Sequence, residues 1–172
     1  METPPLTETA LVVVGHGAVA KDCPRDLVRQ LKVLEGQRQM TGASPTPEEQ
    51  ALEDRIRHWP RTPANDPYGA GCEQLMHSLR PLLPGMTLKL AYLEFSAPTL
   101  PEVIEDLRQT GIITVLVIPS MMTPGGIHSE VDIPQIVEQL QTAYPEMTLR
   151  YAWPFDLTKI AHLMADHVQQ FA

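Results

Sequence analysis

Two histidines and one glutamate, His16, Glu94 and His128, lie at the ends of stretches with the composition of β-strands or in the loops that follow them. Imidazole nitrogens together with a carboxylate suit divalent iron, cobalt, nickel or zinc. Neutral imidazole also accepts protons near neutral pH, so the same side chains can serve as general bases. The three residues therefore predict a site that handles a metal ion, with Glu94 completing the metal shell or accepting protons.

Each of these residues could also have a purely structural role. His16 could cap a turn at the end of a strand, and His128 could hydrogen-bond the backbone at the start of a helix. Glu94 could pair with Lys89 or Arg108 on the surface. The remaining histidines lie in helical patterns and are expected to be solvated or packed: His58, His77, His162 and His167.

Glycines accompany both histidines, Gly15 and Gly17 around the first and Gly125 and Gly126 just before the second. Without Cβ atoms they allow a large planar ligand to approach the backbone. The second pair could also leave N–H groups free for a ligand carboxylate. The sequence has neither of the glycine-rich phosphate-binding patterns, no GxSxG and no nucleophilic cysteine signature, so nucleotide binding and acyl transfer have little support.

The elements that must position these residues are four short apolar runs. The first and third are almost continuously apolar, which is typical of strands covered on both faces of a parallel sheet, whereas the fourth alternates and predicts an edge strand. The four predicted strands are Ala10–Val14, Thr87–Phe95, Ile112–Ile118 and Met147–Ala152.

Amphipathic helices follow the strands. Thr99 with Glu102 forms a capping box, with Pro101 in the first turn, and Asp156 is a plausible cap for the last helix. Strands that alternate with helices predict right-handed crossovers and a doubly wound parallel α/β sheet of the flavodoxin-like class, with helices on both faces. Ligands of such sheets bind beyond the carboxyl ends of the strands. Apolar stripes at helical spacing mark three helices, with Leu100, Val103, Ile104 and Leu107 in one, Ile133, Ile136, Val137 and Leu140 in the next, and Ile160, Leu163, Met164, Val168 and Phe171 in the last.

The length of 172 residues fits a single domain, residues 1–172. Its region 34–68 is longer than one crossover helix requires and reads as an insertion between the first helix and the second strand. Within it we expect a short helix at 48–59 that docks through one apolar stripe, and a further helix at 71–83.

The composition of the chain limits which binding partners and which cellular compartment we expect. Hydrophobic residues make up 43% of the chain and charged residues 20%, which is a globular balance. The net charge is −8 and the 13 Lys and Arg are scattered, so nucleic acid and anionic membranes are not expected partners. There is no apolar run of the roughly 18–20 residues that cross a bilayer, and no secretory signal is visible at the N-terminus, so the cytoplasm is predicted. Cys23 and Cys72 form no disulfide framework or CxxC motif.

Four segments carry a resemblance to a known family: LVVVGHG, AYLEFSAPTLPEVIEDL, VLVIPSMMTPGGIHSEVDIPQIVEQL and YAWPFDLTKIAHLMADHV. They resemble the class II chelatases, in particular the small sirohydrochlorin cobaltochelatases and ferrochelatases. The resemblance implies a chelatase-like four-stranded parallel sheet, here a single half-chelatase unit that forms its cleft as a homodimer. It implies a lyase that inserts cobalt, iron or nickel into sirohydrochlorin, as in cobalamin or siroheme biosynthesis. His16 and His128 match the metal-handling histidines, Glu94 is their acidic partner, and no organic cofactor is expected.

The chain departs from the family after the Gly-His-Gly segment, where the family has a serine and an arginine-containing turn. Here the residues are Ala18 to Asp22, so Lys21 is expected to act as the basic residue. We expect it to contact the tetrapyrrole together with Gly15, Gly17, Gly125 and Gly126. Because a charge of −8 repels a substrate rich in carboxylates, the cleft must be less negative than the whole, with Lys21 and Arg25 as candidates.

Two alternatives stay open. One is a non-catalytic tetrapyrrole- or metal-binding protein on the same fold, which the altered turn and the insertion allow. The other is a flavodoxin-like nucleotide or flavin protein that uses the same rim of the sheet.

Overall fold

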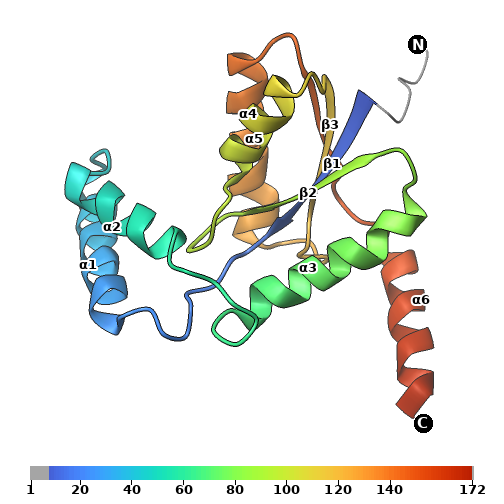
Figure 1. Cartoon of the computed structure of the whole chain (residues 1–172), viewed down its shortest axis with the longest axis horizontal. Helices are drawn as coiled ribbons and strands as arrows, with labels where there is room; N and C mark the ends of the chain where they lie inside the picture. Colours follow the sequence, from blue (N-terminus) through green and yellow to red (C-terminus); the bar gives the residue numbers. More distant parts are fainter. Residues whose placement is uncertain (1–7, 172) are drawn as a thin grey trace.

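The computed structural model of the chain describes residues 8–171, and residues 1–7, which hold most of the N-terminal segment considered for a secretory signal, lie outside this range. A single parallel sheet runs through the molecule in the order β2-β1-β3-β4 (Figure 1). This arrangement confirms the predicted α/β class and the edge position of the fourth strand. The strands are β1 (Thr9–Gly15), β2 (Thr87–Tyr92), β3 (Thr114–Pro119) and β4 (Thr148–Tyr151).

Helices connect and cover these strands. The predicted starts are confirmed at two of them: Thr99 and Glu102 form a complete capping box at α4, and Asp156 accepts the N–H of Thr158 at α6. The helices are α1 (Arg25–Thr41), α2 (Pro47–Arg57), α3 (Pro67–Leu79), α4 (Leu100–Gln109), α5 (Ile133–Ala143) and α6 (Leu157–Val168). Short turns of other helical types are η2 (Arg80–Leu82), η3 (His128–Asp132) and η4 (Gln169–Phe171).

The two faces of the sheet are covered differently. One face packs against α4 and α5 through a large buried cluster that includes Val12, Ile104 and Val117. The other face packs against α3, where Val13 and Met76 belong to a smaller cluster. Alternate residues of β1 therefore point into two separate cores, which explains why its sequence is apolar throughout. Helices on both faces were predicted, and the structure confirms them.

The helices α1 and α2 lie side by side, beside the loops that follow β1 and β2 rather than on the sheet (Figure 1). Their own buried cluster joins Leu31 of α1 and Ile56 of α2 to residues of the loop after β1. An ion pair between Arg38 and Glu49 also links the two helices, at 2.7 Å. The stretch 34–68 thus contains the end of α1, all of α2 and the start of α3. The first helix runs seven residues past the expected start of the insertion, until Gly42 ends it with φ +65°.

Element ends differ from the predictions where polar side chains or turns decide them. The second strand ends at Tyr92 and not at Phe95, because the chain bends from Leu93 onward and reaches φ +57° at Phe95. The helix expected at 71–83 begins at Pro67, since the carboxylate of Asp66 accepts the N–H of Gly69 and caps it.

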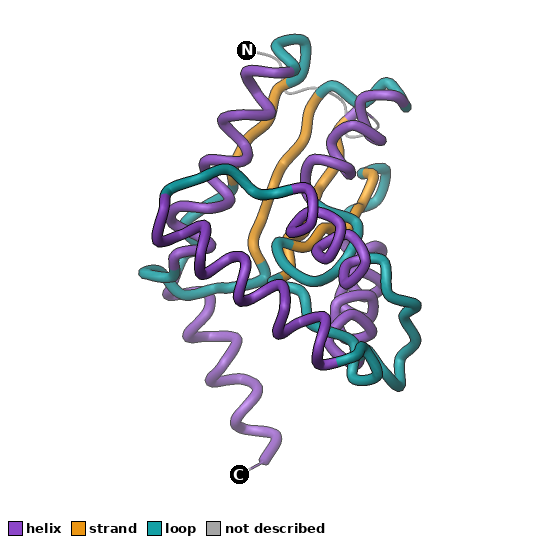
Figure 2. Tube along the Cα trace, turned by 90° about the vertical axis from the view of Figure 1, so that its left-hand side faces the viewer, coloured by secondary structure: helices purple, strands orange, loops and turns teal. Residues whose placement is uncertain are grey.

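The last helix, α6, extends away from the body of the molecule (Figure 2). Every residue of α6 is described, and none of them is buried. Its predicted apolar stripe is exposed, with Leu163 at 57%, Met164 at 63% and Val168 at 63%. The amphipathic pattern was correct for the helix type, but this helix does not pack on its own sheet.

Among residues 8–171, none of the helices combines the length and the hydrophobicity that crossing a bilayer requires.

Candidate metal-binding site

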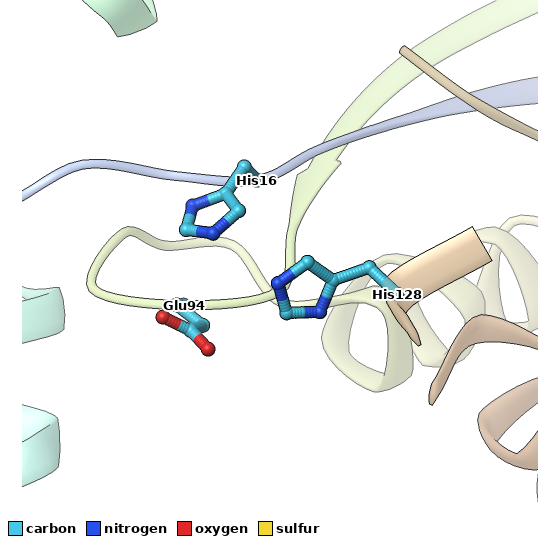
Figure 3. Close-up of side chains that lie close together, drawn as sticks. All are labelled: His16, Glu94 and His128. Atoms are coloured by element: carbon cyan, nitrogen blue, oxygen red, sulfur yellow. The ribbon is translucent and has the colours of Figure 1, made fainter. Parts of the chain in front are cut away.

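The three residues singled out in the sequence meet at one rim of the sheet (Figure 3). One ligand atom from each of His16, Glu94 and His128 lies within 4.8 Å of the others, and all three side chains are half-buried. The imidazole rings are 4.8 Å apart between centroids and nearly perpendicular, at 82°. We refer to these three candidate ligands as the metal-binding trio. Their donor atoms are of the types that divalent first-row metals accept.

The strand order explains why these residues meet. Because β1 lies between β2 and β3, the loops that leave the carboxyl ends of all three strands share one rim. His16 follows β1 directly, Glu94 comes two residues after β2, and His128 opens the π-helical turn η3 beyond the loop after β3. Turns of the π type are frequent at functional sites.

Backbone hydrogen bonds hold the first two loops in register. The N–H of Leu93 donates to the carbonyl of Gly15 at 3.1 Å, and the N–H of Glu94 donates to that of His16 at 2.9 Å. Gly17 has φ +92°, and a Cβ atom there would overlap the carbonyl oxygen of Glu94. Gly17 is therefore required by the approach of another part of the chain, whereas the sequence had suggested the approach of a ligand.

Gly15 also has a structural reason. A Cβ at this position would lie 3.1 Å from the hydroxyl of Tyr68 and 3.2 Å from the ring of Tyr92. The same Tyr68 hydroxyl accepts the N–H of His16 at 2.8 Å. Two tyrosines thus pack against β1 at Gly15, the residue immediately before His16.

Hydrogen bonds fix the tautomer of both histidines. His16 Nδ1 lies 3.0 Å from the carbonyl oxygen of Gly17, and His128 Nδ1 lies 2.6 Å from Oδ2 of Asp132. Because carbonyl and carboxylate oxygens only accept hydrogen bonds, Nδ1 carries the proton in each ring. The Nε2 lone pairs are left to bind a metal ion or take up a proton.

Asp132 is a residue of the candidate site that the sequence analysis missed. It belongs to the same π-helical turn as His128 and orients its ring, the arrangement by which many metal-binding histidines are held. The signal was present, because a histidine followed four positions later by an aspartate at a helix start places both side chains on one side of the turn.

Two hollows adjoin Glu94. One, of about 270 Å³, runs from Glu94 and His128 along α5 to the amide side chains of Gln135 and Gln139. The other lies toward α1 and α2 and brings Glu35 and Glu53 to its lining. Glu94 thus stands between the rim of the sheet and the two helices.

Tyr151 supports the turn that carries His128. Its hydroxyl donates to the carbonyl of Ser129 at 2.9 Å. Burial raises the pKa of Tyr151 to about 12, so the phenol stays protonated and remains a donor throughout the physiological range.

The other residues expected to contact substrate do not join the trio. Lys21 is exposed and lines a separate hollow with Arg25, Arg29 and Lys32, which gathers positive charge in an acidic protein. Gly125 donates its N–H to Glu130 at 3.2 Å, so this group is not free for a carboxylate as expected.

Gly126 has open space where a Cβ would stand. The candidate surface partners of Glu94 are engaged elsewhere, Lys89 with Asp106 and Arg108 with Glu105.

The parallel four-stranded α/β sheet, with two histidines and a carboxylate on its carboxyl rim, has the chelatase-like fold expected from the sequence. The chain belongs to the CbiX family, whose model matches residues 65–170. This match confirms the resemblance to class II chelatases. It includes Glu94 and His128 but not His16, and it leaves out α1 and α2.

Solved structures with the same fold include a protein from Marinobacter aquaeolei VT8 that is named as a CbiX protein of cobalamin (vitamin B12) biosynthesis. The TM-score is 0.52 at 16% sequence identity, and the likeness covers 94% of this chain and 93% of that one. At this identity the likeness shows the fold. No curated protein matches the chain.

Two structures of SirB from Bacillus subtilis are also similar. The sirohydrochlorin chelatase SirB of subspecies spizizenii in complex with cobalt has a TM-score of 0.45 at 19% identity, over 92% of this chain and 50% of that one. SirB with Fe3+ has a TM-score of 0.45 at 18% identity, over 85% and 40%. The chain therefore spans half or less of the Bacillus proteins.

Proposed function

We propose that the chain is a sirohydrochlorin metal chelatase, a lyase that inserts divalent cobalt, iron or nickel into sirohydrochlorin or a related tetrapyrrole. The observation that carries the proposal is the metal-binding trio: one ligand atom from each of the three residues lies within 4.8 Å of the others, and the hydrogen bonds at Nδ1 leave Nε2 of both histidines available. Membership of the CbiX family and the fold shared with a protein named for cobalamin biosynthesis support the tetrapyrrole as substrate.

Metal insertion requires that the ion lose its water ligands and that two pyrrole N–H protons leave the macrocycle. Nε2 of His16 and of His128 can replace water on the metal and can accept protons near neutral pH. Glu94 supplies a negative oxygen that either completes the metal shell or receives a proton. The metal is a substrate in this reaction, and no organic cofactor is required.

The hollow lined by Lys21, Arg25, Arg29 and Lys32 supports the binding of a polycarboxylate. Positive side chains gathered beside the loop after His16 offset the net charge of −8 near the site. We infer that Lys21 faces the substrate from this side. The substrate would then reach the histidines past four glycines, which are Gly15, Gly17, Gly125 and Gly126.

We also infer that the active form is a homodimer. The exposed apolar stripe of α6 and the half-buried Leu116 of β3 are apolar surfaces that a second copy would cover. Apolar side chains arranged along one helix face, as in α6, are typical of association sites. The cytoplasmic location and a place in cobalamin or siroheme biosynthesis remain predictions of the sequence.

The test is anaerobic insertion of cobalt(II) into sirohydrochlorin, followed by absorbance. We expect multiple turnovers by the wild type and a loss of at least about 100-fold in His16→Ala and in His128→Ala. His77→Ala is the matched control, since this histidine is exposed on α3, and it should retain full activity. A folded wild type that accelerates insertion of none of cobalt, iron and nickel would contradict the proposal.

A binding protein on the same fold is the second candidate, because Ala18 stands where the family has a serine hydroxyl. The same assay separates the two functions. Uptake that stops at one metal-loaded tetrapyrrole per site, with no further turnover, identifies a carrier.

A further inference from the structure

Arg61 lies in the loop between α2 and α3, and its guanidinium group sits between the two loops that carry His16 and Glu94. Nη1 donates to the carbonyl of Ala18 at 2.6 Å, two residues after His16. Nη2 donates to the carbonyl of Phe95, which directly follows Glu94. One side chain thus joins the backbones of both loops at the metal-binding trio.

The loop at Phe95 needs such support. Phe95 has φ +57°, a left-handed conformation that is unfavourable for a non-glycine residue and persists only where neighbouring contacts hold it. Its carbonyl receives a hydrogen bond from a charged donor, which is stronger than one from a neutral group. The ring of Phe95 packs against the cluster of α1 and α2, with the ammonium group of Lys32 5.0 Å from its centroid.

The guanidinium group is itself held in place from both sides. Nη1 forms an ion pair with Asp66 at 3.0 Å, and Nη2 reaches the carbonyl of Ile56 at 3.3 Å. Asp66 is buried and also caps α3, so its carboxylate has a fixed position. A planar fork with several N–H groups can reach all these oxygens at once, whereas the single ammonium group of lysine cannot.

We propose that Arg61 is a positioning residue that sets the carboxylate of Glu94 against the imidazole of His16. It acts through the two carbonyl groups and touches no member of the trio. It lies outside the part of the chain that matches the CbiX family, so the segment around α2 contributes to the site without supplying a ligand. The proposal deepens the proposed function and rests on it for the meaning of the activity measurement.

The experiment compares Arg61→Lys with Arg38→Lys in the full-length protein. Arg38 is the matched control because its ion pair with buried Glu49 joins α1 to α2 within the same helical segment, away from the site loops. We expect Arg61→Lys to weaken cobalt(II) binding and to lower kcat, each by about tenfold, with little change in the KM for the tetrapyrrole. Arg38→Lys should lower the Tm while cobalt affinity and kcat stay at wild-type values.

A double variant tests whether the effect passes through Glu94. In a Glu94→Gln background the further change Arg61→Lys should leave cobalt affinity unchanged, because the group it positions is gone. Equal effects of Arg61→Lys with and without Glu94 would overturn the proposal. Equal effects of Arg61→Lys and Arg38→Lys on cobalt affinity would also overturn it, because they would assign Arg61 to general stability.

Chemical rescue gives a further readout that a purely structural role does not predict. Arg61 lines an open hollow beside α3, so guanidinium added at low millimolar concentration can reach the space left in Arg61→Ala. We expect partial recovery of cobalt affinity in this variant and none in Arg38→Ala. A wild type that binds cobalt but inserts none would overturn the proposed function. The role of Arg61 would then still be tested by the cobalt affinities of its variants.

Discussion

Two regions of the molecule meet at the candidate site and are held together differently. The sheet body, formed by β1–β4 with α4 and α5, has a large core of aliphatic side chains. The helical layer, formed by α1 and α2, has a small core and depends on single polar contacts such as Arg38 with Glu49. The sheet body brings the trio together through strand order, and the helical layer adjusts the loops after the strands. The sheet body therefore supplies the side chains of the trio, and the helical layer contributes to their alignment.

The largest effect is expected where the sheet body loses volume. Ile104 of α4 is fully buried in its core, so Ile104→Ala should lower the free energy of unfolding by about 2–5 kcal/mol, measured by urea denaturation. Ile113→Ala is the control, since Ile113 is 48% exposed, and it should change stability by about 0.5 kcal/mol or less. Similar losses in both variants would show that the sheet body is not the dominant core.

The same change in the helical layer should act more locally. Ile56 of α2 is also fully buried, but Ile56→Ala should cost about 2 kcal/mol, the lower end for such a change, because the surrounding cluster is small. Amide hydrogen exchange should rise first in α1 and α2, with β1 and β3 still protected. Exchange that rises evenly across the chain would mean that the two regions unfold as one.

Removing the carboxylate that orients His128 tests how the sheet body holds one of the candidate metal ligands. Asp132→Asn should weaken cobalt(II) binding by about 10-fold or more, because the charged partner of the imidazole is lost while the shape is kept. Glu138→Gln removes the same charge from an exposed position of α5 and should leave the affinity unchanged. Equal effects of the two changes would point to net charge as the cause.

Removing one N-cap side chain from each region compares the two regions through smaller changes in stability. Thr99 caps α4 and Thr46 caps α2, each through its hydroxyl oxygen, so either change to alanine should cost about 1 kcal/mol. Thr99→Ala should shift the urea midpoint of the whole protein. Thr46→Ala should appear chiefly as faster amide exchange within α2, and a full global shift would contradict the distinction.

The smallest effect is a pH dependence at the cap of α4. Hydrogen bonding from the backbone N–H of Thr99 lowers the pKa of Glu102 below its usual range. The folded-state pKa is therefore below the unfolded one, so the stabilisation is full above the ordinary pKa of glutamate and is lost as the pH falls through the folded value. Glu102→Gln should cost about 0.5 kcal/mol at pH 7, and the difference from wild type should shrink on acidification in urea titrations. A difference that is constant from neutral to acid pH would exclude this origin.

The sequence predicted the sheet body better than the helical layer for a physical reason. Apolar runs such as that of β1 and the stripe around Ile104 show directly which faces are buried, and strand ends then bring the trio to one rim. The hydrogen bonds of Arg61 join positions far apart in the sequence and leave no periodic signal. The same holds for Gly17, whose partner is the carbonyl of Glu94. The exposure of α6 could not be predicted either, since an apolar stripe does not tell which surface covers it.

If the trio binds metal as proposed, the close approach of Gly17 to Glu94 has a consequence for altering which metal the protein accepts. Because the backbone at 94 fills the space next to residue 17, the two loops can change only together, and a substitution at Gly17 would displace a ligand. The side chain at 94 is not constrained in this way, since the contact is made by its main-chain oxygen. Replacing Glu94 by cysteine or histidine would therefore exchange a hard donor for a softer one on an unchanged frame, which makes this position the natural place to redesign metal preference.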